Sequence, residues 1–354
     1  MKRIKSIGSY FFIAASFIVM VPDCLRGQPE AWTWLHRKVF NQQELTENQQ
    51  KKEISFYKQQ CNPFTQLVFS WNAFREQDGY FSFWVKVHNK KTDRWGSWHK
   101  MAEWGNGVQR SFASKKDDAR CCYVHVRLEC PEEYADAFRI KILSHDNADL
   151  SLVKSFAVSL SDYTKFKSES VDKKRMRLLP SVRIAAVPKK AQLSLDHPRN
   201  NHLCSPTSCS MVTSFLTGQE IDPVDFAQNA FDAGLNAYGS WPFNTAHAFE
   251  RCQGAVWFAP ARFNEFKELH HQLQRGIPVI VSVRGRIDGA PKSYDSGHLL
   301  VVVGWDAHKQ TVICHDPAFD RADKIVKQYP VKSFLSAWER SHRLAYLAEP
   351  ITGI

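Results

Sequence analysis

Residues 201–212, NHLCSPTSCSMV, place two cysteines five positions apart on either side of a Ser-Pro-Thr-Ser sequence. A helix is predicted directly after Cys204, because Pro206 fits a first helical turn and Gly218 suits the end of a helix. Ser205 is expected to cap the first turn. Free N–H groups and the helix dipole at this end stabilise a thiolate over a thiol. Cys204 is therefore a candidate nucleophile, and a buried structural cysteine is the alternative.

A base for this cysteine is expected on a hairpin further along the chain. Residues 298–316, HLLVVVGWDAHKQTVICHD, predict two strands joined by a tight polar turn at 306–310. Residue 307 lies midway between His298 and Asp316, so a regular hairpin brings these two residues opposite each other, with Cβ atoms about 4.5–5.5 Å apart. A carboxylate at that spacing fixes the tautomer of the imidazole and stabilises the imidazolium. A surface pair of cross-strand polar residues is the alternative.

The other histidines near these segments are weaker candidates for a base. His202 is too close to Cys204 along the chain to face it across a cleft. His308 lies in the turn, and His315 is expected to point to the opposite face of the strand from Asp316. His298 therefore remains the favoured base.

Acyl transfer also needs hydrogen-bond donors for the developing oxyanion. The backbone N–H of Cys204 can supply one, and a side-chain amide commonly supplies the second. Gln192, in VPKKAQLSLD, is a candidate by position, and Asn200 and Asn201 are nearer to the cysteine in sequence. The residues alone leave this choice open.

The first 27 residues predict an export signal. Three basic residues precede a run from Ile7 to Val21 that carries no charge and is too short for a comfortable membrane span. Cleavage is expected after Gly27, with an uncleaved anchor as the alternative. We therefore expect a periplasmic or extracellular protein with no integral membrane bundle.

The charge of the chain restricts its partners. The 354 residues are 44% hydrophobic, which excludes a disordered chain, and carry a formal net charge of +11. Residues 162–190 contain nine basic and three acidic residues, a net charge of +6. This stretch is interpreted as a solvated linker, with attraction to an anionic envelope polymer as the alternative. Nucleic acid is not expected as a partner, because no base-reading motif accompanies the charge.

Two regions with different patterns follow the signal. Residues 28–60 are polar and predicted to be helical or disordered, and residues 61–160 alternate like an antiparallel β-sandwich accessory domain. Residues 161–183 form the basic linker, and residues 184–354 mix helices with strands. The predicted fold class is therefore α+β.

Tryptophans and cysteines are concentrated in the predicted sandwich. The tryptophans pack in its core or, where exposed, stack on sugar rings; they are Trp71, Trp84, Trp95, Trp98 and Trp104. Four cysteines could pair with one another after export; they are Cys61, Cys121, Cys122 and Cys130. The cysteine spacing is not a zinc pattern.

Taken in order, CSPTSCSMV, GIPVIVSV, GHLLVVVGW and HDPA resemble the bacteriocin-processing-type papain-like cysteine peptidases. The closer resemblance is to a secreted, stand-alone bacterial branch that has Cys-Ser-Pro-Thr-Ser at the nucleophile. It covers about residues 185–350, and GSWPFNTAHAF and the upstream SWNA are also similar to segments of that branch. The resemblance implies a papain-like peptidase domain over residues 184–354, preceded by the sandwich.

The resemblance also implies roles for individual residues. Cys204 would be the nucleophile, His298 the base and Asp316 the orienting acid. Gln192, in its Val-Pro-x-x-x-Gln context, would be the oxyanion donor. No metal or organic cofactor is implied.

Three further residues are expected at the substrate groove. They are Trp241, Phe243 and Gly297. Core packing is the alternative for Trp241 and Phe243, and Gly297 is expected to leave room beside the base.

Three functions remain in competition. The first is an exported cysteine peptidase that acts on peptides or proteins. The second is a peptidoglycan amidase or endopeptidase with the same triad, whose sandwich binds a cell-wall polymer. The third is a non-catalytic envelope-binding protein. Cys209 is interpreted as a core residue in all three.

Overall fold

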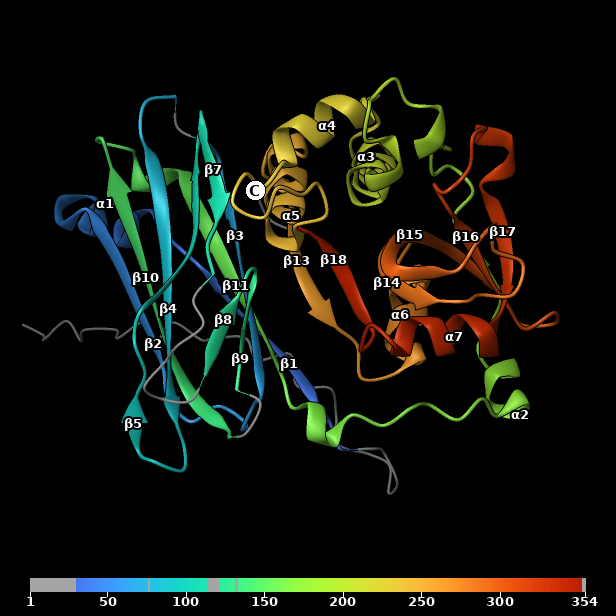
Figure 1. The fold of residues 1–354 in the computed structure, drawn as a ribbon, viewed down its shortest axis with the longest axis horizontal. Helices are drawn as coiled ribbons and strands as arrows, with labels where there is room; N and C mark the ends of the chain where they lie inside the picture. The colour runs from blue at the N-terminus through green and yellow to red at the C-terminus, as the bar shows by residue number, and fades with distance from the viewer. Residues whose placement is uncertain (1–29, 76, 114–120, 131–132, 352–354) are drawn as a thin grey trace, which may run out of the picture. The chain divides into compact units, whose positions relative to one another are not determined.

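The computed structural model describes residues 30–75, 77–113, 121–130 and 133–351 (Figure 1). The expected export signal, residues 1–27, lies outside this part of the chain. No helix within the described ranges is long and apolar enough to cross a membrane. The described residues after Glu30 belong to one compact unit.

Two antiparallel sheets form the first half of the described chain, here called the two-sheet region (residues 31–161). The five-stranded sheet has the order β1 (Thr33–Val39), β11 (Val153–Ser161), β3 (Gln66–Ala73), β9 (Arg127–Glu129) and β8 (Cys122–Val124). The other sheet has the order β2 (Glu53–Lys58), β10 (Ala135–His145), β4 (Tyr80–Asn89), β6 (His99–Gly105) and β7 (Val108–Ser111), and β5 (Arg94–Trp95) pairs with β4. A disulfide joins Cys121 to Cys130 beside β8 and β9.

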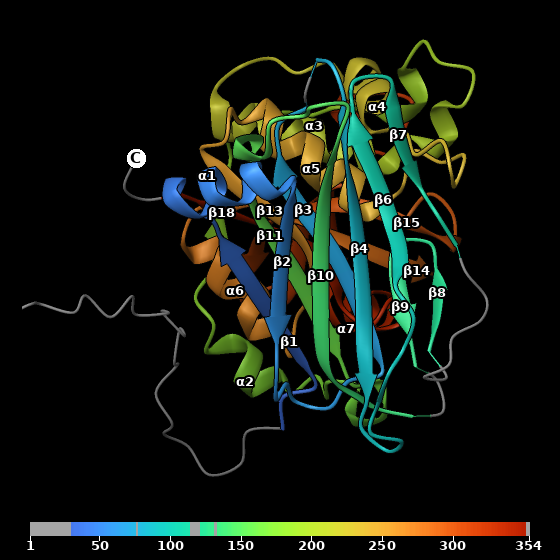
Figure 2. The same ribbon diagram turned by 90° about the vertical axis from the view of Figure 1, so that its left-hand side faces the viewer.

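One hydrophobic core lies between these two sheets. Alternate side chains along β3 and β4 point into it, among them Phe69, Trp71, Phe81 and Phe83, each at most 1% exposed. The period of two in the sequence produces this arrangement, because successive side chains of a strand point to opposite faces. Figure 2 shows the six-stranded sheet in front of the five-stranded one.

The expectation for residues 28–60 was wrong in part. This segment was predicted to be helical or disordered, but it contains strands β1 and β2 on either side of helix α1 (Gln42–Lys51). Each strand pairs with a strand far away in the sequence, β1 with β11 and β2 with β10. Those long-range backbone hydrogen bonds outweigh the polar local composition.

The five tryptophans of this region divide into two groups. Trp71 and Trp104 are buried in the shared core. Trp84, Trp95 and Trp98 are half-buried and lie outside that core. Core packing is therefore confirmed for Trp71 and Trp104, whereas the other three tryptophans are partly accessible to solvent.

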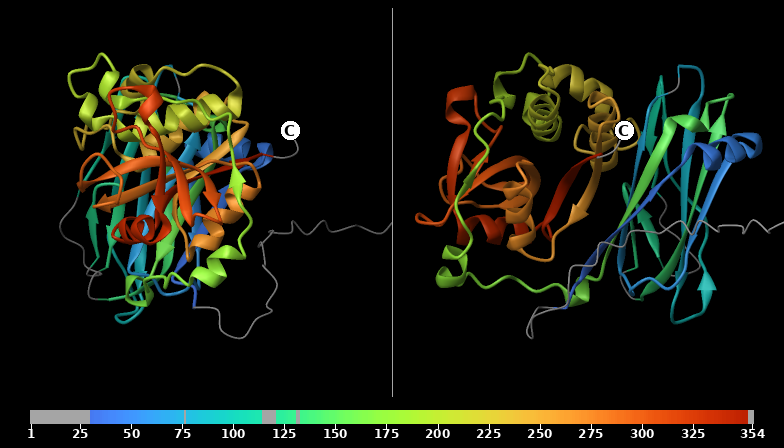
Figure 3. Two further views of the ribbon diagram at one scale, coloured as in Figure 1. Left: turned by 90° about the vertical axis from the view of Figure 1, so that its right-hand side faces the viewer. Right: turned by 180° about the vertical axis from the view of Figure 1, so that it is seen from behind.

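A connection of mixed structure joins the two halves of the chain. It contains a short 3-10 helix at Tyr163–Lys165 and helix α2 (Lys173–Arg177). It ends in β12 (Val182–Arg183), which pairs with the C-terminal sheet. Figure 3 shows this connection in green from two further directions.

The C-terminal half is built on a seven-stranded antiparallel sheet. Its order is β13 (Val256–Arg262), β18 (Leu344–Pro350), β14 (Val279–Gly285), β15 (Tyr294–Asp306), β16 (Thr311–His315) and β17 (Val326–Pro330), with β12 paired to β15. Its helices are α3 (Cys204–Thr217), α4 (Pro223–Ala230), α5 (Trp241–Arg251), α6 (Phe266–Gln274) and α7 (Val331–Glu339). The mixture of helices with antiparallel sheets confirms the α+β prediction.

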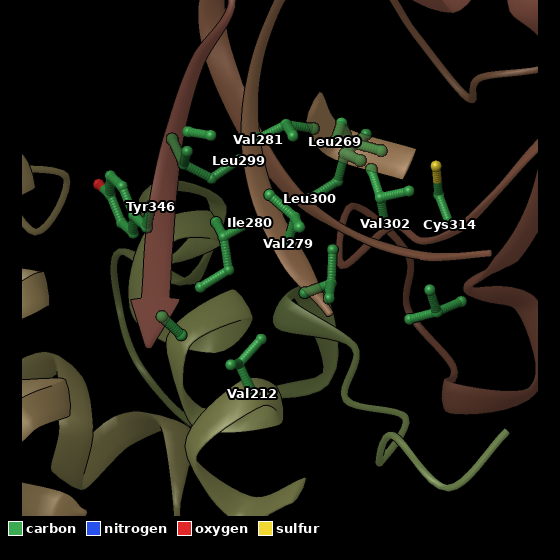
Figure 4. Close-up of a cluster of buried hydrophobic side chains, with 14 of the residues drawn as sticks. Val212, Leu269, Val279, Ile280, Val281, Leu299, Leu300, Val302, Cys314 and Tyr346 are labelled. Carbon is green, nitrogen blue, oxygen red and sulfur yellow. The ribbon is translucent and has the colours of Figure 1, made fainter. Parts of the chain in front are cut away.

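Helices cover both faces of the central strands of this sheet. Residues 279–283 of β14 are buried in succession, as expected for a strand that is covered on both sides. Figure 4 shows Val212 of α3 and Leu269 of α6 packed around side chains of β14 and β15. This packing fixes the N-terminal end of α3 near strand β15.

Polar contacts tie the two-sheet region to the C-terminal half. The side chain of Asn72 on β3 donates to the carbonyl of Phe258 and accepts from its N–H, both at 3.0 Å. Arg75 forms a largely buried ion pair with Glu250 of α5, at 2.5 Å, and its guanidinium lies 3.9 Å above the ring centre of Trp104. These contacts hold β3 against β13 and α5.

We expect Glu250→Ala to lower the free energy of unfolding of the full chain by about 3–5 kcal/mol, because it leaves the buried Arg75 cation without its partner. Urea unfolding followed by tryptophan fluorescence measures this. Arg321→Ala is the control, because its ion pair with Asp323 is more than 60% exposed at both side chains and is screened by water and salt, so its loss should change the free energy of unfolding far less. Equal losses in the two variants would contradict the role given to Arg75 and Glu250.

Candidate active site

Cys204 is the first residue of α3 and is half-buried. Leu203 occupies the N-cap position and supplies no side-chain cap, so the N–H groups of the first turn face the cysteine end of the helix. The expectation that Ser205 caps the helix was wrong, because its hydroxyl is buried and hydrogen-bonds Tyr346 at 2.9 Å. Gly218 ends the helix with φ of 68°, as predicted.

The structure brings His298 and Asp316 together through a register different from the predicted one. His298 Nε2 lies 2.8 Å from Asp316 Oδ1. The two residues are not directly opposed, because Val301 pairs with His315, and His298 instead pairs with Val283 of β14. A β-bulge between Val302 and Gly304 shifts the hairpin. Asp316 follows the last residue of β16 and reaches His298 from beyond the end of that strand.

Two tyrosines that the sequence analysis did not identify also bind Asp316. The hydroxyls of Tyr294 and Tyr329 each donate to Asp316 Oδ2 at 2.6 Å, and the N–H of Ala318 donates to Oδ1 at 3.0 Å. The ring of Tyr294 also stacks on His298, with centroids 4.1 Å apart. Asp316 is fully buried, so these donors replace the water that it has lost.

A sequence signal existed for one of the two tyrosines. Tyr294 precedes His298 by four residues on β15, a spacing that places both on one face of a strand. Tyr329 lies on β17 opposite Val312, and its approach to Asp316 depends on the pairing of β16 with β17, a strand that the sequence analysis did not identify.

The charges of the site favour a thiolate–imidazolium pair. Burial alone would raise the pKa of Cys204, but the hydrogen bond and charge of His298, with the N–H groups of Leu299 and Ser205, lower that pKa below its ordinary value. Burial alone would lower the pKa of His298, but the Asp316 carboxylate and the Cys204 sulfur raise it to about 9. The pKa of Asp316 is lowered: burial opposes ionisation, but His298 and the two tyrosines outweigh it.

Other thiols of the chain differ from Cys204 in this respect. Burial raises the pKa of Cys61 to about 11 and that of Cys252 to about 12. Burial also raises the pKa of Cys209 and Cys314 well above the ordinary value. Cys209 is 1% exposed, which confirms its interpretation as a core residue.

Gln192 lies in the same cleft as Cys204 and is held from two directions. Its side-chain Nε2 donates to the carbonyl of Asn200 at 3.1 Å, and its backbone N–H donates to the carbonyl of Pro317, next to Asp316. Its Oε1 is buried without a hydrogen-bond partner in the described chain. The side chain of Asn200 donates to Leu193 and Leu195 carbonyls, so it is occupied in holding the loop, whereas Asn201 lines the cleft.

Cys204 and His298 lie in a cleft of about 720 Å³. Of the three expected groove residues, Trp241 and Gly297 line this cleft. Gly297 has φ of 89°, which favours glycine, and the space where a Cβ would stand is open. The expectation for Phe243 was wrong: it is completely buried and packs edge-on against Trp71, because its face of α5 points to β3.

The two-sheet region also contributes to this cleft. Gln66 of β3 and Arg127 and Glu129 of β9 line it. Gln66 is hydrogen-bonded to Arg262 of β13 at 2.9 Å and to Tyr163 at 2.7 Å, so these residues link the two halves at the cleft.

The cleft carries an excess of positive charge. Six arginine or lysine residues line it, against the two carboxylates of Glu129 and Asp295. Within the described ranges, five of the six make no ion pair, and the sixth, Arg127, pairs with Glu129 at 2.5 Å. The five are Arg199, Arg262, Arg284, Lys292 and Arg340.

The geometry suits nucleophilic chemistry by a cysteine. A thiolate next to an imidazolium can attack a carbonyl, and the imidazolium can then protonate the leaving group. In the part of the chain that the structure describes, no group of three or more His, Cys, Asp or Glu residues is placed to hold a metal ion.

A comparison with known protein families points to the same chemistry. Residues 184–346 match the model of the Peptidase_C39 like family. Among solved structures the chain is similar to xylellain, a cysteine protease from Xylella fastidiosa, at 10% identity over 52% of this chain and 91% of that one. The TM-score of 0.31 is too low to establish a shared fold. No curated protein matches the sequence significantly.

We expect Cys204 to react with iodoacetamide at pH 6, where Cys61 and Cys252 do not, because its pKa is lowered and theirs are raised. Asp316→Asn should slow this reaction by about tenfold or more at pH 6, since each unit by which the thiol pKa rises removes about nine-tenths of the thiolate. Peptide mapping by mass spectrometry gives the rate at each cysteine, with fully unfolded protein at pH 9 as the control in which all free thiols react. Equal rates at the three cysteines in the folded chain would refute the ion pair.

Proposed function

We propose that this chain, a cysteine-type peptidase, hydrolyses peptide bonds with a triad of Cys204, His298 and Asp316. The observation that carries the proposal is the 2.8 Å hydrogen bond between His298 and Asp316 in the cleft that also contains Cys204, whose pKa His298 lowers. The same arrangement weighs against a non-catalytic envelope-binding protein. A structural cysteine needs neither a lowered pKa nor an oriented imidazole.

The proposed reaction begins with the thiolate of Cys204 and the imidazolium of His298. The sulfur attacks the carbonyl carbon of the scissile amide and forms a tetrahedral intermediate. His298 then transfers its proton to the amide nitrogen, the C–N bond breaks, and the amine leaves. Neutral His298 next takes a proton from water, whose oxygen attacks the thioester; the carboxylic acid leaves and the ion pair is restored.

Asp316 acts through His298 in this scheme. Its carboxylate stabilises the imidazolium and fixes the ring so that the other nitrogen faces the sulfur. Tyr294 and Tyr329 keep the carboxylate in place and ionised. We assign the oxyanion to the backbone N–H of Cys204 and to Gln192, whose amide has one N–H beyond the bond to Asn200.

We further propose a papain-like peptidase domain preceded by a β-sandwich accessory domain, as in the secreted stand-alone branch of the bacteriocin-processing-type peptidases. The shared core of the two N-terminal sheets supports the sandwich. The Cys121–Cys130 disulfide supports export to an oxidising compartment, periplasmic or extracellular. The charged residues and uncharged run of residues 1–27 support the same destination.

The positive charge of the cleft supports acidic peptides as substrates. Five cations that make no ion pair with any described residue line it and raise the local concentration of anionic ligands. Peptides that carry carboxylates on either side of the cleaved bond fit this charge best. A peptide released from a cell-wall polymer would qualify where it is acidic.

We expect Cys204→Ala to abolish hydrolysis of a peptide library and to leave the circular dichroism spectrum unchanged. Cys209→Ala is the matched control, because Cys209 lies five residues later on the same helix and is buried in the core; it should retain activity to within about threefold. Product identification by mass spectrometry checks both results. Retained turnover in Cys204→Ala would refute the nucleophile, and loss of activity in a folded Cys209→Ala would show that the wrong cysteine was chosen.

A second expectation concerns substrate charge. Peptides with Glu on both sides of the cleaved bond should have kcat/KM about 3–10-fold above matched Gln peptides, and added salt should reduce the difference by screening. Arg284→Gln should weaken the preference. Arg286→Gln is the control, because Arg286 is two residues further along, 85% exposed, outside the cleft lining and paired with Asp288. Hydrolysis that depends on Cys204 but shows no charge preference would refute the substrate class and leave the peptidase proposal standing.

A further inference from the structure

The outer face of the six-stranded sheet carries a cluster of rings and cations away from the cleft. It is made of Tyr57 on β2, Trp84, Trp95 and Trp98 on or near β4 and β5, and the cations Lys86, Arg139 and Lys141. We call these seven residues the aromatic–basic face. Figure 2 looks onto this side of the sheet, and no described helix or strand lies in front of it.

The cations of this face are interleaved with the rings. Arg139 lies 4.7 Å from the ring centre of Tyr57 and 4.6 Å from that of Trp95. Lys86 lies 5.4 Å from Trp95 and 5.0 Å from Trp98. The rings are half-buried or, for Tyr57, 43% exposed, so their outer edges remain available.

The same three cations lack acidic partners. Lys86, Arg139 and Lys141 form no ion pair within the part of the chain that the structure describes, and Arg139 Nε has no hydrogen-bond partner there. The carboxylates of neighbouring residues are already used: Asp136 pairs with His88, and Glu103 pairs with Lys100 and Arg110.

Strand register makes this charge unfavourable for the sheet itself. Arg139 of β10 is the direct cross-strand partner of Lys86 on β4, and like charges directly opposite each other destabilise a sheet. Lys141 lies two residues from Arg139 on the same face. Burial, then the neighbouring charges of Arg139 and Lys141, lower the pKa of Lys86. Within the described chain the rings contact these cations but no carboxylate neutralises them, and an anionic ligand would supply the missing negative charge.

We propose that the aromatic–basic face binds an anionic polysaccharide, with its cations on the carboxylate or phosphate groups and its rings against the sugars. The guanidinium of Arg139 matches the geometry of a carboxylate or phosphate. Tryptophan and tyrosine rings offer apolar surface together with a polar edge. The disulfide of the same region points to an oxidising compartment, which favours an envelope glycan over a nucleic acid. The face is separate from the cleft, because none of its seven residues lines the cleft.

The test measures binding of the full chain to four probes at 50 mM and 200 mM salt by isothermal titration calorimetry. The probes are alginate, a phosphomannan, neutral dextran and a 20-nucleotide oligo-dT. We expect at least one of the two anionic glycans to bind at least tenfold more tightly than dextran and oligo-dT, with the stronger of the two identifying the carboxylate or phosphate source. Equal binding of dextran, tighter binding of oligo-dT, or no binding of either anionic glycan would overturn the proposal.

Variants separate this face from the general positive charge of the chain. Lys86→Gln with Lys141→Gln should weaken glycan binding at least tenfold and reduce its salt dependence. Lys309→Gln with Lys324→Gln removes the same charge from exposed positions in the C-terminal half, and should weaken binding by less than threefold. Trp98→Ala should weaken binding without reducing the salt dependence. Thermal unfolding verifies that each variant is folded, and equal losses in the two double variants would overturn the assignment to this face.

Discussion

The buried carboxylate of Asp316 is the constraint on which the arrangement of the site depends. A fully buried charge without water needs partners at nearly every lone pair, and Asp316 receives His298, Tyr294, Tyr329 and the N–H of Ala318. Two of these donors come from β15, one from β17 and one from the loop after β16. The strands must therefore keep their order and register for the charge to be tolerated. Once it is tolerated, it raises the pKa of His298, and that imidazolium in turn lowers the pKa of Cys204.

Helix α3 brings the proposed nucleophile Cys204 to His298 from the side opposite Asp316. Its first residue is Cys204, and its buried residues pack on the central strands β14 and β15. The sulfur is therefore positioned by helix packing, and the imidazole by strand pairing. Since both depend on one hydrophobic core, a change in that core moves the nucleophile relative to the base. This explains how Cys204, His298 and Asp316, which come from three separate segments, are held close together.

Local sequence predicted what depends on local chemistry and missed what depends on pairing. The helix after Cys204 and its end at Gly218 follow from Pro206 and the glycine, and the two strands of the hairpin follow from their apolar runs. The hairpin register was wrong because a bulge near Val302 gives no strong signal in the sequence.

Residues whose surroundings come from distant segments were the hardest to predict. Phe243 was assigned to the groove although it packs against Trp71, in a segment far away along the chain. Tyr329 was overlooked because it lies on β17, a strand that the sequence analysis did not identify, 13 residues after Asp316. Strands β1 and β2 were missed because their partners, β11 and β10, lie 80 to 128 residues away.

The two-sheet region borders the positively charged cleft and carries the second positively charged surface of the molecule, the aromatic–basic face. Strands β3 and β9 of its first sheet supply Gln66, Arg127 and Glu129 to the cleft, while its second sheet carries the aromatic–basic face. Contacts of Asn72 and Arg75 hold this region to the C-terminal half, so the surfaces keep a fixed relation to each other. If the outer face holds an anionic polymer, acidic peptides attached to that polymer are presented to the cleft at a raised effective concentration. A cleft with weak affinity for any single peptide would then still be supplied with substrate, which is a physical reason for a peptidase to retain a cationic sheet face that is unfavourable for its own stability.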